Sequence, residues 1–139
     1  MAVATSIMRA QQVILARADA ALRPFELTFA RYEVLMLLLF SKKGVLPLGK
    51  IGERLQVNAA SVTSAVDRLE KDGLVVRVPN PADGRGVLAE ITRQGRLLSQ
   101  DATERMNATV FADLGMDADD LAVLFEALRT LRRAAGDFD

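Results

Sequence analysis

The chain has 139 residues, half of them hydrophobic, with 18 basic and 18 acidic side chains. This length and composition predict one domain with a substantial apolar core. The sequence contains no cysteine and no histidine, which excludes disulfides, thiol-based redox sensing, and the commonest general base and metal ligand. We therefore expect neither a metal nor a cofactor.

Neither export nor membrane insertion is expected from the sequence. The longest apolar run, residues 34–40, is far shorter than the roughly 20 residues that a membrane span requires. The first residues become polar before an apolar signal region develops. These features predict a cytoplasmic protein with no membrane partner.

The first two predicted helices are rich in apolar residues. Residues 5–23 have an apolar stripe at helical spacing, and Pro24 is expected to end this helix. Thr28 is placed to cap a second helix over 29–40, where apolar residues are dense enough for burial on most sides.

Two short helices follow in close succession, the first within residues 47–57 and the second over 59–72. Asn58 is a good N-cap for the second helix, and Gly73 is expected to end it. Only about three residues separate the two helices, a spacing that is typical of a helix-turn-helix motif.

The apolar pattern changes from helical to alternating directly after Gly73. Two stretches rich in β-branched residues, 74–78 and 87–91, flank the turn signal PNPADGRG and predict a β-hairpin with Arg85 at its tip. A long helix over about 93–114 and a last helix over 117–134 complete the chain. The fold class is therefore mainly α, with six helices and one small hairpin.

The outer face of the 59–72 helix suits the major groove of DNA. With the apolar side chains turned inward, a step of about 100° per residue turns six others outward: Ala60, Ser61, Thr63, Ser64, Asp67 and Arg68. Small residues permit close approach, hydroxyls bond phosphates or base edges, and arginine can bind guanine. Taken alone, such a face is also that of any amphipathic helix exposed to solvent.

The hairpin beside this helix favours the DNA interpretation. An arginine on a rigid ribbon can enter the minor groove, where the potential is most negative. Asp83 would repel phosphate, so we expect it to hold Arg85 in position. The segment from Lys42 to Arg96 has ten basic and six acidic residues, and the rest of the chain has eight and twelve. This basic middle segment suggests an anionic partner. Together with the helix pair and the hairpin, it favours DNA binding over the alternative that Arg85 is an ordinary arginine in a surface turn.

The stretches LTFARYEVLMLL and VNAASVTSAVDRLEKDGLVVRVPNPADGRGVLAEIT, and the order of elements around them, resemble the MarR family. The similarity covers nearly the whole chain. It implies a winged helix-turn-helix regulator of transcription, a ligand-responsive repressor that binds a pseudo-palindromic operator as a homodimer. It also implies a dimerisation helix in 1–27, a DNA-binding lobe in 28–92 with recognition helix 59–72 and wing 74–92, and further dimerisation helices in 93–139.

This resemblance and the outward face together give the candidate DNA-binding residues. They are Asn58, Ala60, Ser61, Thr63, Ser64, Arg68, Asp83 and Arg85. The sequence departs from the family at one point, because many members have two consecutive arginines where this chain has Gly84 before Arg85. This difference predicts weaker or less salt-sensitive binding to double-stranded DNA.

The terminal helices predict a homodimer, because their apolar stripes exceed what a small lobe can cover. The alternative is an intramolecular bundle. In the MarR family, small aromatic or acidic effectors bind where the dimer helices meet the DNA-binding lobe. The candidate ligand-binding residues are Arg9, Phe25, Phe29, Arg31, Tyr32 and Met36. Three of these also share one helical face, as residues of a core do: Phe29, Tyr32 and Met36.

Two other functions are alternatives to DNA binding: an enzyme, and a sensor that does not bind DNA. An enzyme is not expected, because no nucleophile elbow or phosphate-binding loop occurs. The available carboxylates, those of Glu53, Asp67, Glu70 and Asp72, are spaced from basic residues as surface ion pairs. A dimeric winged-helix sensor or interaction protein that does not bind DNA is compatible with the zero net charge.

Overall fold

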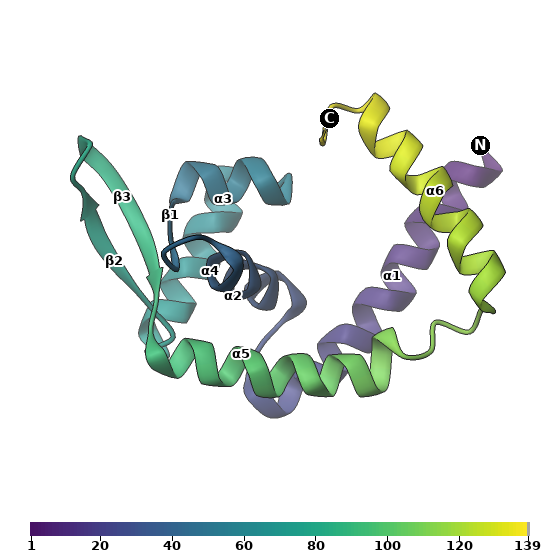
Figure 1. The fold of residues 1–139 in the computed structure, drawn as a ribbon, viewed down its shortest axis with the longest axis horizontal. Helices are drawn as coiled ribbons and strands as arrows, with labels where there is room; N and C mark the ends of the chain where they lie inside the picture. The colour runs from purple at the N-terminus through teal and green to yellow at the C-terminus, as the bar shows by residue number, and fades with distance from the viewer. Residues whose placement is uncertain (139) are drawn as a thin grey trace.

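A computed structural model describes residues 1–138 and shows six α-helices with a small three-stranded sheet. Figure 1 shows the hairpin at one end of the molecule, α1 and α6 at the other, and α5 running between them. In chain order the elements are α1 (Ala2–Leu22), η1 (Arg23–Phe25), α2 (Phe29–Phe40), β1 (Val45–Pro47), α3 (Leu48–Leu55), α4 (Ala59–Lys71), β2 (Val75–Asn80), β3 (Asp83–Ile91), α5 (Arg93–Met106), η2 (Asn107–Phe111) and α6 (Ala118–Ala134).

Side-chain caps start four of the helices. The side-chain oxygens of Thr28, Asn58, Thr92 and Asp117 each accept a hydrogen bond from the backbone N–H three residues later. The N···O distances are 3.4, 2.8, 3.0 and 2.9 Å. Each bond satisfies a donor that the first helical turn leaves without a partner. The predicted starts of α2, α4, α5 and α6 are therefore confirmed.

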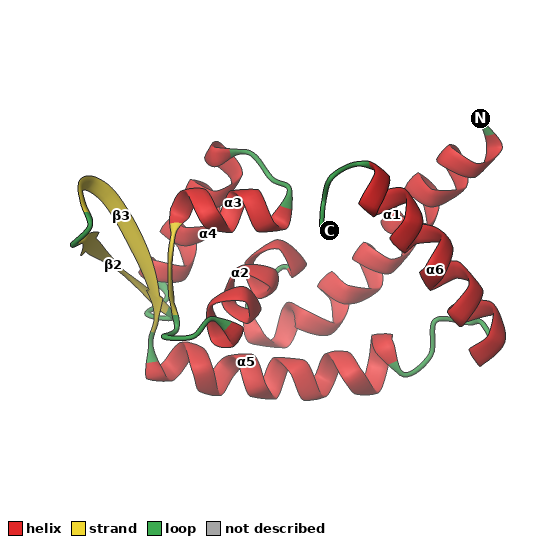
Figure 2. Ribbon diagram, turned by 45° about the horizontal axis from the view of Figure 1, so that its top comes forward, coloured by secondary structure: helices red, strands yellow, loops and turns green. Residues whose placement is uncertain are grey.

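The sheet has one strand more than the sequence predicted. Its order is β1-β3-β2, and both pairings are antiparallel, with Val45 opposite Glu90 and Val75 opposite Ile91. β1 is only three residues long, too short to produce an alternating pattern. Figure 2 shows the three strands together beside the helices. β1 ties the start of the helix pair to the hairpin.

The hairpin turn is tighter than predicted. We expected a wing tip over 79–86 with Arg85 in the turn, but only Pro81 and Ala82 lie between the strands. Asn80 pairs with Asp83, and the Asn80 side-chain oxygen accepts a hydrogen bond from the Ala82 N–H at 3.0 Å. Arg85 therefore lies in the extended strand β3, three residues beyond the turn.

The hydrophobic core is centred on α2, which packs against α1, α3, α4 and α5. Leu35 and Leu38 of α2, Ile51 of α3 and Leu69 of α4 are completely buried. Contact with four other helices buries much of α2 and explains why most of its residues are apolar. We refer to residues 28–92, from the cap of α2 to the end of the sheet, as the central lobe.

The terminal helices differ from the predicted boundaries. The first helix begins at Ala2, and Pro24 lies in a 3-10 turn after it, at a position where proline is tolerated. The predicted helix over 93–114 is α-helical only to Met106 and continues as a π-helical turn, with the Ala112 N–H donating to the Asn107 carbonyl. α6 contains no buried residue.

Candidate nucleic-acid interface and an adjoining cleft

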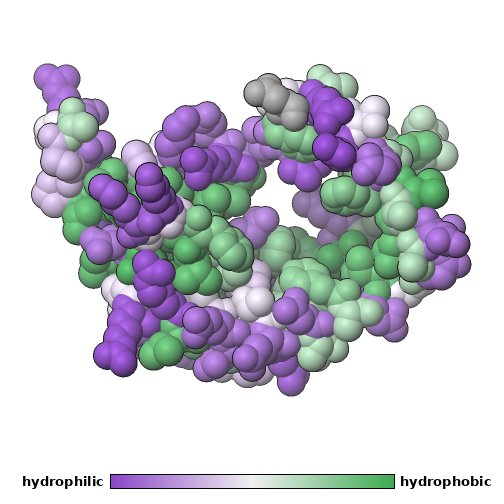
Figure 3. All heavy atoms as spheres, in the orientation of Figure 1, coloured by the Kyte–Doolittle hydropathy of each residue, from purple (hydrophilic) through white to green (hydrophobic). Residues whose placement is uncertain are grey.

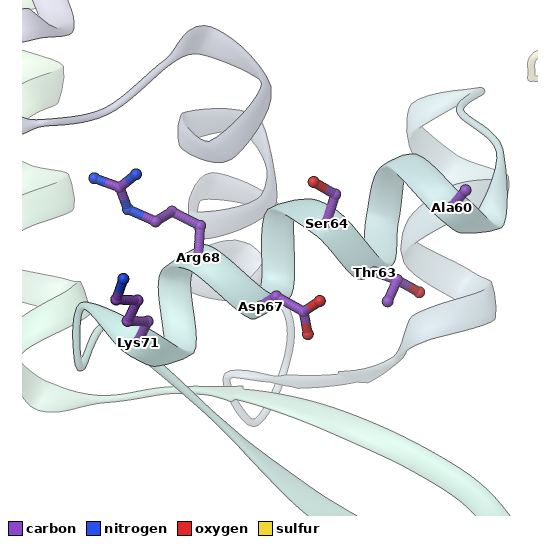
Figure 4. A pocket seen from close by; sticks show the side chains of 6 residues that line it. All are labelled: Ala60, Thr63, Ser64, Asp67, Arg68 and Lys71. Carbon is purple, nitrogen blue, oxygen red and sulfur yellow. The ribbon is translucent and has the colours of Figure 1, made fainter.

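The α4 helix presents a polar face made of small and hydroxyl-bearing residues. All six positions predicted to face outward are exposed: Ala60, Ser61, Thr63, Ser64, Asp67 and Arg68. Their spacing follows from the opposite stripe, because Val62, Val66 and Leu69 are buried in the core. Figure 4 shows five of the outward side chains with Lys71, lining a shallow depression along the helix.

Residues at both ends of this face also make contacts within the protein. Asn58 is engaged as the helix cap through its side-chain oxygen. The Arg68 Nε lies 3.0 Å from the Asp72 carboxylate, one helical turn along. This pair and the Lys50–Glu53 pair in α3, at 3.0 Å, follow the predicted helical spacing.

Asp67 and Glu70 form ion pairs with an arginine that was not among the candidate residues. Arg77 of β2 lies 2.5 Å from Asp67 and 2.9 Å from Glu70, both on α4. Its backbone N–H also donates to Glu70 at 2.8 Å. These backbone and side-chain hydrogen bonds lower the pKa of the Glu70 carboxyl. Arg77 thereby joins the hairpin to α4, a contact that helical spacing alone could not reveal.

The hairpin presents Arg85 beyond this junction. The Asp83 carboxylate accepts a hydrogen bond from the Arg85 backbone N–H at 3.0 Å. It therefore contacts the main chain of Arg85 rather than its guanidinium. Within residues 1–138 no hydrogen bond or ion pair of the Arg85 guanidinium is found, and the residue is exposed. An ideal Cβ at the neighbouring Gly84 would have no atom within 4 Å.

A cleft separates the central lobe from the terminal helices. Its first part, of about 490 Å³, lies between α1, α2, the end of α3 and Phe111 of η2. Its second part, of about 300 Å³, continues along α2 and shares Phe29, Glu33, Leu55 and Phe111 with the first. Figure 3 shows a hollow between the lobe and the terminal helices, with apolar side chains at its border.

Three of the six predicted ligand-binding residues line this cleft: Phe29, Tyr32 and Met36. Tyr32 is also part of the core, as the alternative interpretation had it, with its side chain 5% exposed and its hydroxyl 2.8 Å from Thr103 Oγ1. The structure does not bring the other three predicted residues to the cleft. Arg9 is exposed on α1, and Phe25 packs against the core.

Arg31 faces a different region. Its Nη2 donates to the Glu26 carbonyl at 3.1 Å, and the side chain borders a separate hollow with Asp19, Arg23 and Arg68. Neither predicted arginine is therefore available to an anion in the cleft.

Glu33 is the cleft residue that the sequence analysis missed. It is half-buried, and this burial raises the pKa of its carboxyl. Within the described chain the carboxylate has no hydrogen-bond or ion-pair partner. The signal was present in the sequence, because Glu33 is one helical turn from Phe29 and therefore lies on the same face.

Comparison with known proteins gives the family. A sequence profile of the MarR family matches residues 25–86. Sco5413, a MarR family transcriptional regulator from Streptomyces coelicolor, is 53% identical over 100% of this chain and 96% of its own, with a TM-score of 0.93. The chain belongs to the MarR family of transcriptional regulators. The resemblance on which the sequence analysis relied is confirmed.

Some of the solved structures that resemble this chain contain a bound molecule. MarR from E. coli, in a mutant complexed with operator DNA, is 25% identical over 94% of both chains, with a TM-score of 0.87. CouR from Rhodococcus jostii RHA1, bound to p-coumaroyl-CoA, is 28% identical over 96% of this chain and 91% of its own, with a TM-score of 0.81.

The family is one of regulators rather than enzymes. In residues 1–138, no group of three or more histidine, cysteine, aspartate or glutamate side chains is arranged to hold a metal ion. Among the described helices of this MarR family member, none has the length and apolar character needed to cross a membrane.

Proposed function

We propose that this MarR family member represses transcription by binding a pseudo-palindromic operator as a homodimer, and that an effector in the cleft releases it. The observation that carries the DNA-binding part is the polar face of α4 beside a hairpin whose Arg85 guanidinium has no partner in the described chain. Helices of this kind enter the major groove while an adjacent arm reaches the minor groove.

The roles of individual residues follow from their positions. Ala60, Thr63 and Ser64 would approach base edges and phosphates, and Arg68 would reach a base or phosphate from the next turn. Asn58 and Ser61 would lie near the backbone at the helix N-terminus, where anions are favoured. Arg85 would enter the minor groove, and Asp83 would fix the backbone from which it extends.

Dimerisation would use the terminal segments 1–27 and 93–139. α6 has no buried residue, yet it exposes Val123, Leu124, Phe125 and Leu131. α1 likewise exposes Met8 and Val13. Exposed apolar side chains of this extent favour association, and they do not support the intramolecular bundle. A two-fold axis would set the two α4 helices about 34–36 Å apart, one turn of DNA.

The cleft supports regulation by a small molecule. It lies between the lobe and the helices proposed to form the dimer, so its occupant can alter the spacing of the two α4 helices. The structure of CouR, which has the same fold, contains bound p-coumaroyl-CoA. We propose no catalytic activity, since Glu53, Asp67, Glu70 and Asp72 are all ion-paired. A protein that binds chromosomal DNA would act in the cytoplasm.

The test is binding to labelled DNA from the region upstream of the protein's own gene, with a shuffled sequence as the competitor. Affinity should fall steeply between about 50 and about 200 mM salt. Arg85→Ala should weaken binding at least about tenfold, with unchanged dimerisation and thermal stability. Arg105→Ala, at an exposed position of α5, is the matched control.

Two results would contradict this function. No affinity for the upstream fragment at low salt would favour the alternative, a dimeric sensor that does not bind DNA. A large loss of stability in Arg85→Ala would mean that this arginine has a structural role.

A further inference from the structure

The cleft between the lobe and the terminal helices has one charged side chain. Its lining is apolar apart from Gln11, Gln56, the Tyr32 hydroxyl and the Glu33 carboxylate. The Tyr32 hydroxyl is already engaged with Thr103 at 2.8 Å. Among residues 1–138, no lysine or arginine lines either part of the cleft. The electrostatic character of the cleft is therefore set by a single negative charge.

Aromatic rings line the same cleft as this charge. Phe29, Tyr32, Phe40 and Phe111 line the part of the cleft that contains Glu33. The Phe29 and Tyr32 rings lie with their centroids 6.1 Å apart and an angle of 32° between their planes. The faces of such rings attract cations, and the attraction is stronger where water is displaced. Aromatic rings beside a carboxylate are a favourable environment for an ammonium group.

An anionic ligand would meet the opposite conditions. Its carboxylate would be brought close to Glu33 in a partly desolvated site with no cation to offset the repulsion, and like charges at such range are unfavourable. Arg9 and Arg31 were predicted to bind an acidic effector, but neither lines the cleft in the described chain.

We propose that the effector of this protein is a hydrophobic cation, an apolar or aromatic molecule with an amine, and that Glu33 selects it by its charge. The apolar body would lie against Phe29, Met36 and Leu55, and the ammonium would donate to the Glu33 carboxylate. Because Glu33 has no partner in the described chain, it can accept this bond without breaking another. The regulatory consequence rests on the function proposed above.

The test uses three probes with one naphthalene ring and different charge: 2-naphthylmethylamine, 2-naphthylmethanol and 2-naphthoate. Their binding to the full chain is measured by isothermal titration calorimetry in the absence of DNA. The amine should bind at least about tenfold more tightly than the carboxylate. In Glu33→Gln this preference should disappear, because the site keeps its shape but loses its charge. Glu104→Gln, at an exposed position of α5, should retain it.

Three results would overturn the proposal: a tighter complex with 2-naphthoate, an unchanged preference in Glu33→Gln, or no binding of the amine at millimolar concentration. The last would also be the outcome if the second protomer filled the cleft. Since the titration contains no DNA, its failure leaves the regulator function standing, and failure to bind DNA leaves the titration readable. If both functions hold, the amine should release upstream DNA from the wild type and not from Glu33→Gln.

Discussion

Replacing Gly84 by arginine tests whether the hairpin lies against the DNA backbone. Gly84 stands where many MarR family members have a second arginine, directly before Arg85. The position is exposed in β3, and a Cβ there would have no atom within 4 Å. A side chain should therefore be accepted without rearrangement of the hairpin, so that the change adds one positive charge and little else.

The size of the effect follows from counterion release. One added phosphate contact per protomer gives two per dimer, and each steepens the slope of log affinity against log salt by about 0.9. The slope should therefore steepen by about 1.8. Over a fourfold change in salt, the ratio of variant to wild-type affinity should fall about twelvefold.

The assay is fluorescence anisotropy with the upstream DNA fragment at several salt concentrations between about 50 and about 200 mM. Gly84→Ala should have the wild-type slope, because it changes the backbone without adding charge. Gln100→Arg adds the same charge at an exposed position of α5 and should change the slope little. An unchanged slope in Gly84→Arg would refute the placement of the hairpin at the phosphates.

Three further variants test the contacts that build the site. Arg77→Gln should weaken DNA binding by roughly three- to tenfold, because Asp67 and Glu70 lose the cation that joins them to β2; faster amide hydrogen exchange in the hairpin would show the loosening, and unchanged exchange would contradict it. Gly95→Ala should lower stability by about 3 kcal/mol and the Tm by roughly 10 °C, because the new Cβ would meet the Leu74 carbonyl and, at 2.9 Å, Ile91 Cγ1. Gly49→Ala, with no neighbour within 4 Å, should not lower the Tm. Glu33→Gln should raise the Tm at pH 7 and not near pH 4: burial raises the pKa of this carboxyl in the folded state, so its ionisation destabilises the fold as pH rises through that pKa. An equal gain at both values would exclude an electrostatic cause.

The features predicted correctly from the sequence are those that depend on neighbouring residues. Thr28 and Asn58 cap the helices they were expected to cap, because a cap is a contact within four residues. The outward face of α4 was also correct, since the buried stripe of a helix fixes the opposite face.

The features that were missed depend on residues distant in the sequence. β1 is a strand only because β3 supplies its hydrogen-bond partners. Val45 is opposite Glu90, which lies 45 residues later in the sequence. Asp67 was expected to pair within its own helix, but Arg77 reaches it from the next strand. Glu33 shares a helical face with Phe29, but its place in the cleft also depends on the position of Phe111 in η2, which is distant in the sequence.

These long-range contacts also indicate where regulation can act. Arg77 joins the hairpin to α4, and β1 joins the hairpin to the start of α3, so the surface proposed to meet DNA moves as one unit. The cleft lies outside that unit, where the lobe meets α1 and η2. We expect an effector there to leave the shape of each DNA-binding surface unchanged and to shift the lobe relative to the terminal helices. On a two-fold operator such a shift changes the separation of two α4 helices that must match one turn of DNA. The effector should therefore lower the affinity for a full operator far more than the affinity for a single half-site. An equal loss of affinity for both DNAs would mean that the ligand acts inside the lobe.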